Sequence, residues 1–298
     1  MTLRILLAVL VFNLFSCQNT SKKTDLLSPG ISKELADFRK EQLSEIVYKL
    51  DFTIPEKLED SIPAALLLEV TIDNHLKPLY LDFNVPEGHV KNVIANGKEI
   101  TIYHEQEHLI IPSAHLNRGA NTFKIDFIAG EQSLNRNEEF LYTLLVPDRA
   151  STLFPVFDQP NLKALYNLKI TAPKDWKVLA GAPEISTETT GAYTTHNFGT
   201  SDKMSSYLFS FVAGKFSEAE QNSVAFPMTL LYRETDSAKI TSSLNPIFEL
   251  HAGAVEYLEE YTAYPFPFQK LDFAAIPIFN TAEWSTWALF NTGNLPCF

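Results

Sequence analysis

The sequence predicts a mainly β fold, an antiparallel sandwich or saddle, followed by a shorter α/β segment. Short alternating apolar runs separated by turn residues fill the chain as far as about Tyr232, aromatic residues make up 12%, and proline occurs 17 times. Aromatic residues favour strands, and many short strands with frequent turns are typical of antiparallel sandwiches. At Asp236 the apolar spacing changes to that of a helix, which indicates a second kind of structure.

The elements follow in chain order. Ser32 is placed to cap a helix through Leu35, Phe38, Leu43 and Ile46. A hairpin is predicted at Val93–Ile100, because Asn96-Gly97 supplies both positive φ angles of a type I′ turn. Alternation and flanking turn residues predict the other strands, at Leu79–Val85, Phe123–Ile128, Tyr142–Val146, Leu165–Thr171, Trp176–Ala180, Tyr207–Val212 and Met228–Tyr232.

The α/β segment begins with a helix whose apolar residues include Leu244, Phe248 and Val255. Neither Pro265 nor Pro267 can continue that helix, so it ends before them. The run Lys270–Pro277 is then predicted to be a strand.

Composition narrows the classes of protein. The chain has 298 residues, enough for about two domains. Its 45% hydrophobic and 20% charged residues are typical of a globular protein. A formal net charge of −12 without a basic block argues against a nucleic-acid partner. Two cysteines, Cys17 and Cys297, are too few for a disulfide framework or a Cys-based zinc module.

The N-terminus is predicted to be a lipoprotein signal. Arg4 precedes the apolar run Ile5–Phe15, which is shorter than the ~20 residues that span a bilayer and has the length of a signal-peptide core. The run ends in Leu14-Phe15-Ser16-Cys17, which resembles a bacterial lipoprotein signal with Cys17 as the lipid attachment residue. The alternative is an ordinary signal peptide that contains a cysteine. The lipoprotein interpretation places the chain in the bacterial cell envelope, membrane-anchored, facing the periplasm or the cell surface.

One segment matches a zinc motif, His104-Glu105-Gln106-Glu107-His108, which has the pattern H-E-x-x-H. That motif needs a helix, because residues i and i+4 must share a face to reach one zinc ion. Here the flanking residues, Ile100–Tyr103 and Leu109–Pro112, are strand-like. We therefore interpret the segment as the solvated tip of a β hairpin and reject His104, Glu105 and His108 as a metal or catalytic site.

Residues 142–164 carry a family resemblance; they are YTLLVPDRASTLFPVFDQPNLKA. This segment resembles the F-P-C-F-D-[EQ]-P-x-x-K-A segment of the M1 zinc aminopeptidases, the family of aminopeptidase N and leukotriene A4 hydrolase. Three further segments resemble the same family in order and spacing, namely Leu168–Trp176, Leu208–Phe216 and Tyr257–Pro277. The resemblance extends from about residue 35 to residue 279.

The resemblance implies a saddle-like β domain that caps a thermolysin-like catalytic domain, of which this chain holds the first α/β segment. The family removes N-terminal amino acids from peptides. Its zinc, held by two His and one Glu, polarises the carbonyl and activates a water, and a motif Glu acts as base. A G-x-M-E strand supplies a carboxylate for the substrate's α-amine.

None of these catalytic residues transfers to this chain. The helical H-E-x-x-H is expected beyond Phe298, and Val146 occupies a position where many members carry an amine-binding Glu or Gln. Glu283 lies near the expected G-x-M-E carboxylate, but its neighbours do not match, so the role is not assigned to it. We therefore name no catalytic residue and expect no zinc in this chain, although the intact family enzyme uses zinc.

The tail from Asn280 is expected to be out of frame. Phe279–Thr292 can be back-translated so that the string, started at its third base, encodes QYGGMEHVGAIQY. This contains G-G-M-E-H, an accepted form of the missing motif. Loss of one base in the Phe279 codon would produce the printed tail.

These observations divide the chain into a signal peptide (1–17), a tether and N-terminal helix (18–45), a β domain (46–231), the start of a truncated catalytic domain (232–279) and an out-of-frame tail (280–298). The favoured function is an N-terminal fragment of an envelope zinc aminopeptidase, inactive as written, whose intact form acts on peptides. One alternative is a retained, non-enzymatic β-domain lipoprotein with a binding or accessory role. Another is a small metalloprotease that uses His104 and His108.

Overall fold

The computed structural model describes residues 26–221 and 226–276. These residues are mainly β, as predicted, and their strands form four sheets. Cys17, Glu283 and the expected out-of-frame tail lie outside the described residues. Within the described ranges, no helix is both long and apolar enough to cross a membrane.

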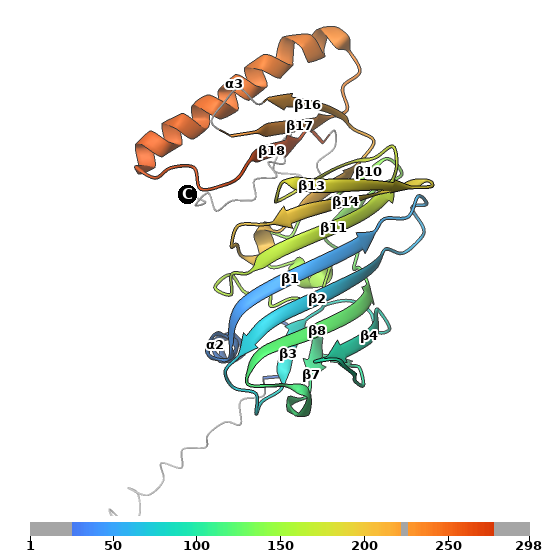
Figure 1. Cartoon of the computed structure of the whole chain (residues 1–298), viewed down its shortest axis with the longest axis vertical. Coiled ribbons are helices and arrows are strands. Elements are labelled where there is room, and N and C mark those ends of the chain that lie inside the picture. The colour runs from blue at the N-terminus through green and yellow to red at the C-terminus, as the bar shows by residue number, and fades with distance from the viewer. Residues whose placement is uncertain (1–25, 222–225, 277–298) are drawn as a thin grey trace, which may run out of the picture.

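The largest sheet has eight strands in the order β13-β14-β11-β1-β2-β8-β4-β5 (Figure 1). All neighbours in it are antiparallel except β1 and β11, which run parallel with Val47 opposite Leu165. The strands are β1 Leu43–Thr53, β2 Pro63–Ile72, β4 Val90–Ala95, β5 Lys98–Glu99, β8 Gly119–Ile128, β11 Leu165–Pro173, β13 Glu184–Thr190 and β14 Tyr193–Thr200.

Two smaller sheets pack against the large one. One has the order β12-β15-β10-β9 and the other β3-β7-β6. The Phe52 ring of β1 lies 5.3 Å from that of Phe211 in β15, and the Phe127 ring of β8 lies 5.4 Å from that of Phe83, directly after β3, so the core lies between the layers. The strands are β3 Leu79–Asp82, β6 Tyr103–Glu105, β7 His108–Ile111, β9 Leu134–Arg136, β10 Phe140–Thr143, β12 Lys177–Ala180 and β15 Phe211–Gly214.

The α/β segment lies at one end of the molecule (Figure 1). Its sheet has the order β16-β17-β18, with strands Ser217–Gln221, Met228–Tyr232 and Leu271–Ala274, and α3 (Ser237–Thr262) connects the parallel pair β17 and β18. Asp236 caps α3 by accepting hydrogen bonds from the amides of Ala238 and Lys239. Phe248 and Val255 are buried against the sheet, so periodicity identified the packed face of this helix correctly.

Several local predictions are confirmed. Ser32 caps α2 (Lys33–Gln42) by accepting from the amide of Leu35. Asn96 and Gly97 have φ angles of 51° and 80°, as a type I′ turn requires. The strand predicted at Met228–Tyr232 has those bounds.

The strands predicted at Leu79–Val85, Tyr142–Val146 and Lys270–Pro277 end earlier than predicted, at Asp82, Thr143 and Ala274. Two other boundary predictions are also wrong. The first helix ends at Gln42, because Leu43 and Ile46 belong to β1, where Leu43 pairs with Ile72 of β2. The strand predicted from Tyr207 begins only at Phe211, because Ser206–Leu208 form a 3₁₀ turn (η4) in which Phe209 donates to the Ser206 carbonyl. In both places pairing or turn hydrogen bonds override the pattern of apolar residues.

Candidate functional site

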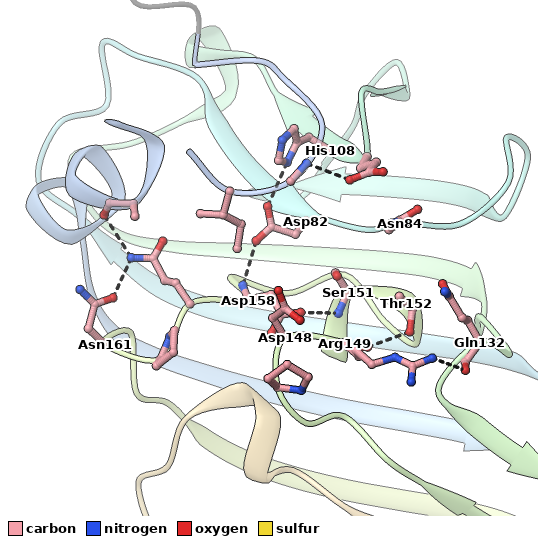
Figure 2. A pocket seen from close by; sticks show the side chains of 17 residues that line it. Asp82, Asn84, His108, Gln132, Asp148, Arg149, Ser151, Thr152, Asp158 and Asn161 are labelled. Carbon is pink, nitrogen blue, oxygen red and sulfur yellow. Dashed lines mark hydrogen bonds and ion pairs between the residues drawn. The ribbon is translucent and has the colours of Figure 1, made fainter. Parts of the chain in front are cut away.

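A cavity of about 850 Å³ lies where three segments meet: the residues before α2, the turn between β6 and β7, and the connection from β10 to β11 (Figure 2). That connection contains most of the segment that carries the family resemblance. Charged and amide side chains dominate the lining, among them Asp82, Glu107, Asp148, Arg149, Asp158 and Gln159.

The base of the site is an ion pair between Arg39 and Asp82. The last turn of α2 carries Arg39, which is 0% exposed, and Asp82 ends β3. Arg39 Nη1 donates to Asp82 Oδ2 at 2.7 Å and Nη2 to Oδ1 at 2.6 Å, a bidentate arrangement. Arg39 Nη2 also donates to the carbonyl of Tyr80 at 2.9 Å. Planar, bidentate pairing of this kind is the strongest form of a charged hydrogen bond.

Asp82 is fully engaged by other groups as well. The Asp158 amide donates to its Oδ2 at 2.8 Å, and His108 Nδ1 lies 2.9 Å from its Oδ1 (Figure 2). Burial disfavours the charged carboxylate, but the Arg39 charge and the hydrogen bonds outweigh burial and hold the pKa of Asp82 below its ordinary value. Asp82 is therefore an ionised, saturated junction rather than a group free to act on a ligand.

Asp158, the aspartate of the F-D-x-P motif, organises the neighbouring loop. Its Oδ2 accepts from the Ser151 amide at 2.9 Å, and its Oδ1 accepts from Ser206 Oγ at 2.7 Å. Burial raises the pKa of Asp158 above its ordinary value, and the nearby Asp82 charge acts in the same direction. The Asp158 carboxylate and the hydrogen bond that its backbone amide donates to Asp82 together connect η3 (Ala150–Thr152), η4 and β3.

A buried aromatic cluster supports the same loop. Tyr48 of β1 accepts a hydrogen bond at its hydroxyl from the Phe157 amide at 2.9 Å and stacks on Tyr166 with ring centroids 5.1 Å apart. Burial raises the pKa of both tyrosines, so both stay neutral at physiological pH. Arg39 lies 5.6 Å from the centroid of the Phe157 ring, which adds a cation–π contact beneath the ion pair.

The H-E-x-x-H segment lies in a β hairpin. Glu105 of β6 pairs with His108 of β7 across a turn formed by Gln106 and Glu107. His104 Nε2 donates to the Phe83 carbonyl at 2.7 Å, and His108 Nε2 donates to the Ser28 carbonyl at 2.9 Å. The two imidazoles are thus directed at different backbone groups rather than at a shared ion.

The expectation of a solvated tip is wrong for His108, which is 0% exposed. The ring is buried because the residues before α2 pass over it, a contact between positions 80 residues apart that the local pattern does not encode. Among residues 26–221 and 226–276, no group of three His, Cys, Asp or Glu side chains is arranged to hold a metal ion.

Val146, at the position where the family resemblance expects an amine-binding residue, is 54% exposed and directly precedes the cavity-lining Pro147. His251 of α3 stacks on Phe273 of β18 with ring centroids 4.3 Å apart. Neither side chain belongs to the buried charged network.

Sequence reasoning missed the Arg39–Asp82 pair. Asp82 alternates with Leu79, Leu81 and Phe83, a pattern that places it on the solvent face of its strand. The sequence pointed only to Asp158, which stands in the family-resemblance segment and whose backbone amide donates to Asp82 in the structure.

The class of protein follows from comparison with known families. The Peptidase M1 N-terminal domain matches residues 46–208, more than half of the chain, and the chain belongs to this family. It is 31% identical to human glutamyl aminopeptidase over 145 residues, which are 48% of this chain and 15% of that protein. It is 24% identical to bovine endoplasmic reticulum aminopeptidase 2 over 258 residues, or 80% of this chain and 26% of the relative.

The fold agrees with a solved structure. An M1 zinc metallopeptidase from Deinococcus radiodurans superimposes with a TM-score of 0.64 at 15% identity, covering 81% of this chain and 58% of that one. The chain thus spans about a quarter or less of the length of the two curated relatives above. Asp82, His108 and Asp158 of the charged network lie within the matched residues 46–208, and Arg39 precedes them.

Proposed function

We propose that this chain is the N-terminal part of an envelope zinc aminopeptidase that removes N-terminal amino acids from peptides, and that the chain as printed is inactive by itself. The observation that carries the proposal is the match of residues 46–208 to the Peptidase M1 N-terminal domain, supported by aminopeptidase relatives. Zinc belongs to the intact enzyme in this proposal, and we expect the printed chain to bind none.

The proposed inactivity rests on the chemistry of the one H-E-x-x-H in the sequence. Zinc hydrolases of this type need two imidazoles on one helix face and a carboxylate beside the metal-bound water. His104 and His108 instead donate to the carbonyls of Phe83 and Ser28. A third function, a small metalloprotease built on these two histidines, is disfavoured by the same geometry.

The β domain itself would act as a cap and positioning wall for the catalytic part. Arg39, Asp82 and Asp158 fix the connection from β10 to β11, and that connection carries Val146 on the surface. A rigid loop held by buried charges is suited to forming one side of a substrate cleft. No catalytic step is assigned to any of these residues.

The alternative is a retained, non-enzymatic β-domain lipoprotein. It is favoured by one observation: the domain has a continuous core of its own, with Tyr48, Phe52 and Phe127 almost completely buried. Such a module could persist as a binding or accessory protein without the catalytic part.

Sequencing the gene through and beyond the Phe279 codon distinguishes the two. The aminopeptidase proposal predicts G-x-M-E codons in the frame shifted by one base, followed by H-E-x-x-H codons. If neither set of codons is present, the retained module becomes the better account. Residues 1–17 are proposed to be the lipoprotein signal in both cases, with Cys17 as the membrane anchor.

A further inference from the structure

The H-E-x-x-H hairpin, which the proposed function leaves without a role, is fastened to the residues that precede α2. The Gly30 amide donates to Glu107 Oε2 at 2.8 Å, and the Ser28 carbonyl accepts from His108 Nε2 at 2.9 Å. The partners are 77 and 80 residues apart in the chain. Two adjacent side chains thus bind a backbone N–H and a backbone carbonyl of one short segment.

The hairpin is held rigidly in the shape that this contact requires. Gln106 and Glu107 have φ angles of 50° and 66°, a left-handed conformation that non-glycine residues adopt only when their surroundings enforce it. The Glu107 carbonyl accepts from the Phe83 amide at 2.8 Å, and the His104 ring stacks on that of Phe83 at 5.7 Å. A preorganised clamp loses little entropy when it binds its partner.

The buried charged network fixes His108, the second of the two residues that bind the segment. His108 Nδ1 lies 2.9 Å from Asp82 Oδ1, and Asp82 is fixed by Arg39. Arg39 belongs to α2, the helix that the fastened segment leads into. The segment is therefore bound by Glu107 and His108 and leads directly into the helix that Ser32 caps.

The fastened segment also forms part of the cavity wall. Gly30 and Ile31 line the cavity, as do Pro147 and Asp148 of the β10–β11 connection. Pro29 and Gly30 are exposed, and hydrogen bonds to Glu107 and His108 attach the segment to the hairpin. Segments of this kind open locally without unfolding of the core.

We propose that residues 28–31 are a strap, fastened by Glu107 and His108, that closes one side of the cavity and holds the segment leading into α2 against the turn between β6 and β7. Release of the strap opens the cavity on that side while the sheets remain folded. The strap does not depend on zinc, on catalysis or on the lipid anchor, so its test is separate from that of the proposed function.

Amide hydrogen exchange of the full chain tests the strap, with Gly30 as the reporter. Glu107→Ala removes the acceptor and is expected to speed exchange of the Gly30 amide by about tenfold or more, because hydrogen bonds to charged groups are the stronger ones. Glu107→Gln keeps a neutral acceptor and should give an intermediate rate. The control is Glu105→Ala, an exposed acid of the same hairpin, which should leave the rate unchanged.

A second pair of variants approaches the strap from its own side. Gly30 has a φ of 74°, and no atom lies within 4 Å of the place that a Cβ would occupy, so Gly30→Ala strains the strap without a clash and should speed exchange at Ile31. Gly88, with a φ of 83° and the same free space, is the matched control. The proposal is overturned if Glu107→Ala leaves Gly30 protected, if exchange rises equally in β2 and β8, or if Gly88→Ala loosens the strap as much as Gly30→Ala.

Discussion

Arg39 and Asp82, 43 residues apart, form a buried bidentate ion pair that joins α2 to the end of β3. The Asp158 amide binds the same carboxylate, so a helix, a strand and the loop of the family motif meet at one charged group. Buried charges cost desolvation energy and are tolerated when every hydrogen-bonding position is satisfied. Both oxygens of Asp82 are bonded, while Arg39 Nε has no hydrogen-bond partner among the described residues, and the pair with the Asp158 amide forms a structural junction of the domain.

Removing either partner of the Arg39–Asp82 pair should therefore lower the stability of the folded domain strongly. Arg39→Met leaves Asp82 buried without its cation, and breaking a buried pair in this way costs about 3–5 kcal/mol. Urea unfolding of the full chain measures the change. Lys33→Met, which removes an exposed i,i+4 pair with Asp37 in the same helix, should unfold near the wild-type midpoint. Equal, mild effects of the two substitutions would contradict the assigned role of Arg39.

The same pair predicts a pH dependence. Because the pKa of Asp82 is lowered in the folded state, its stabilisation is present above the ordinary value of about 3.9 and is lost as pH falls through the folded pKa. The stability difference between wild type and Asp82→Asn should be constant near neutral pH and shrink below about pH 4. Unfolding titrations from pH 7 to pH 2 test this, and a difference that grows on acidification would refute it.

Two glycines predict opposite responses to alanine. A Cβ at Gly130 would lie 1.9 Å from the Thr152 carbonyl oxygen, a backbone atom that cannot move away easily. Gly130→Ala should lower the free energy of unfolding by at least about 1–3 kcal/mol, as overpacking does. Gly253 lies within α3 with open space around the position of a Cβ, so Gly253→Ala should raise the free energy of unfolding by about 1 kcal/mol. Thermal unfolding of both variants measures these changes. An alanine at Gly130 that leaves the unfolding temperature unchanged would mean that Gly130 and Thr152 lie farther apart than the structure places them.

The lipid anchor is tested through its attachment residue. If Cys17 is acylated, Cys17→Ser should move the protein from the membrane fraction to the soluble fraction and abolish the mass added by the lipid. Cys297→Ser is the control, because it removes the other cysteine and should leave fractionation unchanged. Membrane retention of Cys17→Ser with unchanged mass would show that the lipoprotein prediction is wrong. Both cysteines lie outside the described residues.

Local features of the fold were predictable from sequence. The Asn96-Gly97 turn, the Ser32 cap and the change to helical spacing at Asp236 each depend on nearby residues, so the pattern alone identifies them. Pairing between distant strands was not predictable, and the parallel contact of β1 with β11 is an example. Nothing in the sequence near Val47 specifies Leu165 as its neighbour.

The candidate site was predictable only in part. Asp158 stands within the family motif. The alternation of apolar and polar residues nevertheless places its partner Asp82 on the solvent face, because such a pattern does not show which polar residue will contact a distant cation. The pattern places His108 in solvent for the same reason, since Ser28 covers it from far along the chain. Buried polar networks depend on tertiary contacts, which single-sequence patterns do not contain.

The most direct test of the central proposal is zinc content together with hydrolysis of an aminoacyl p-nitroanilide. Both are measured on the purified 298-residue chain and on the product of the reading frame restored at the Phe279 codon. We expect no stoichiometric zinc and no hydrolysis from the printed chain, and both from the restored product, because only the latter gains the helical H-E-x-x-H. Stoichiometric zinc and aminopeptidase activity in the 298-residue chain itself would contradict the account.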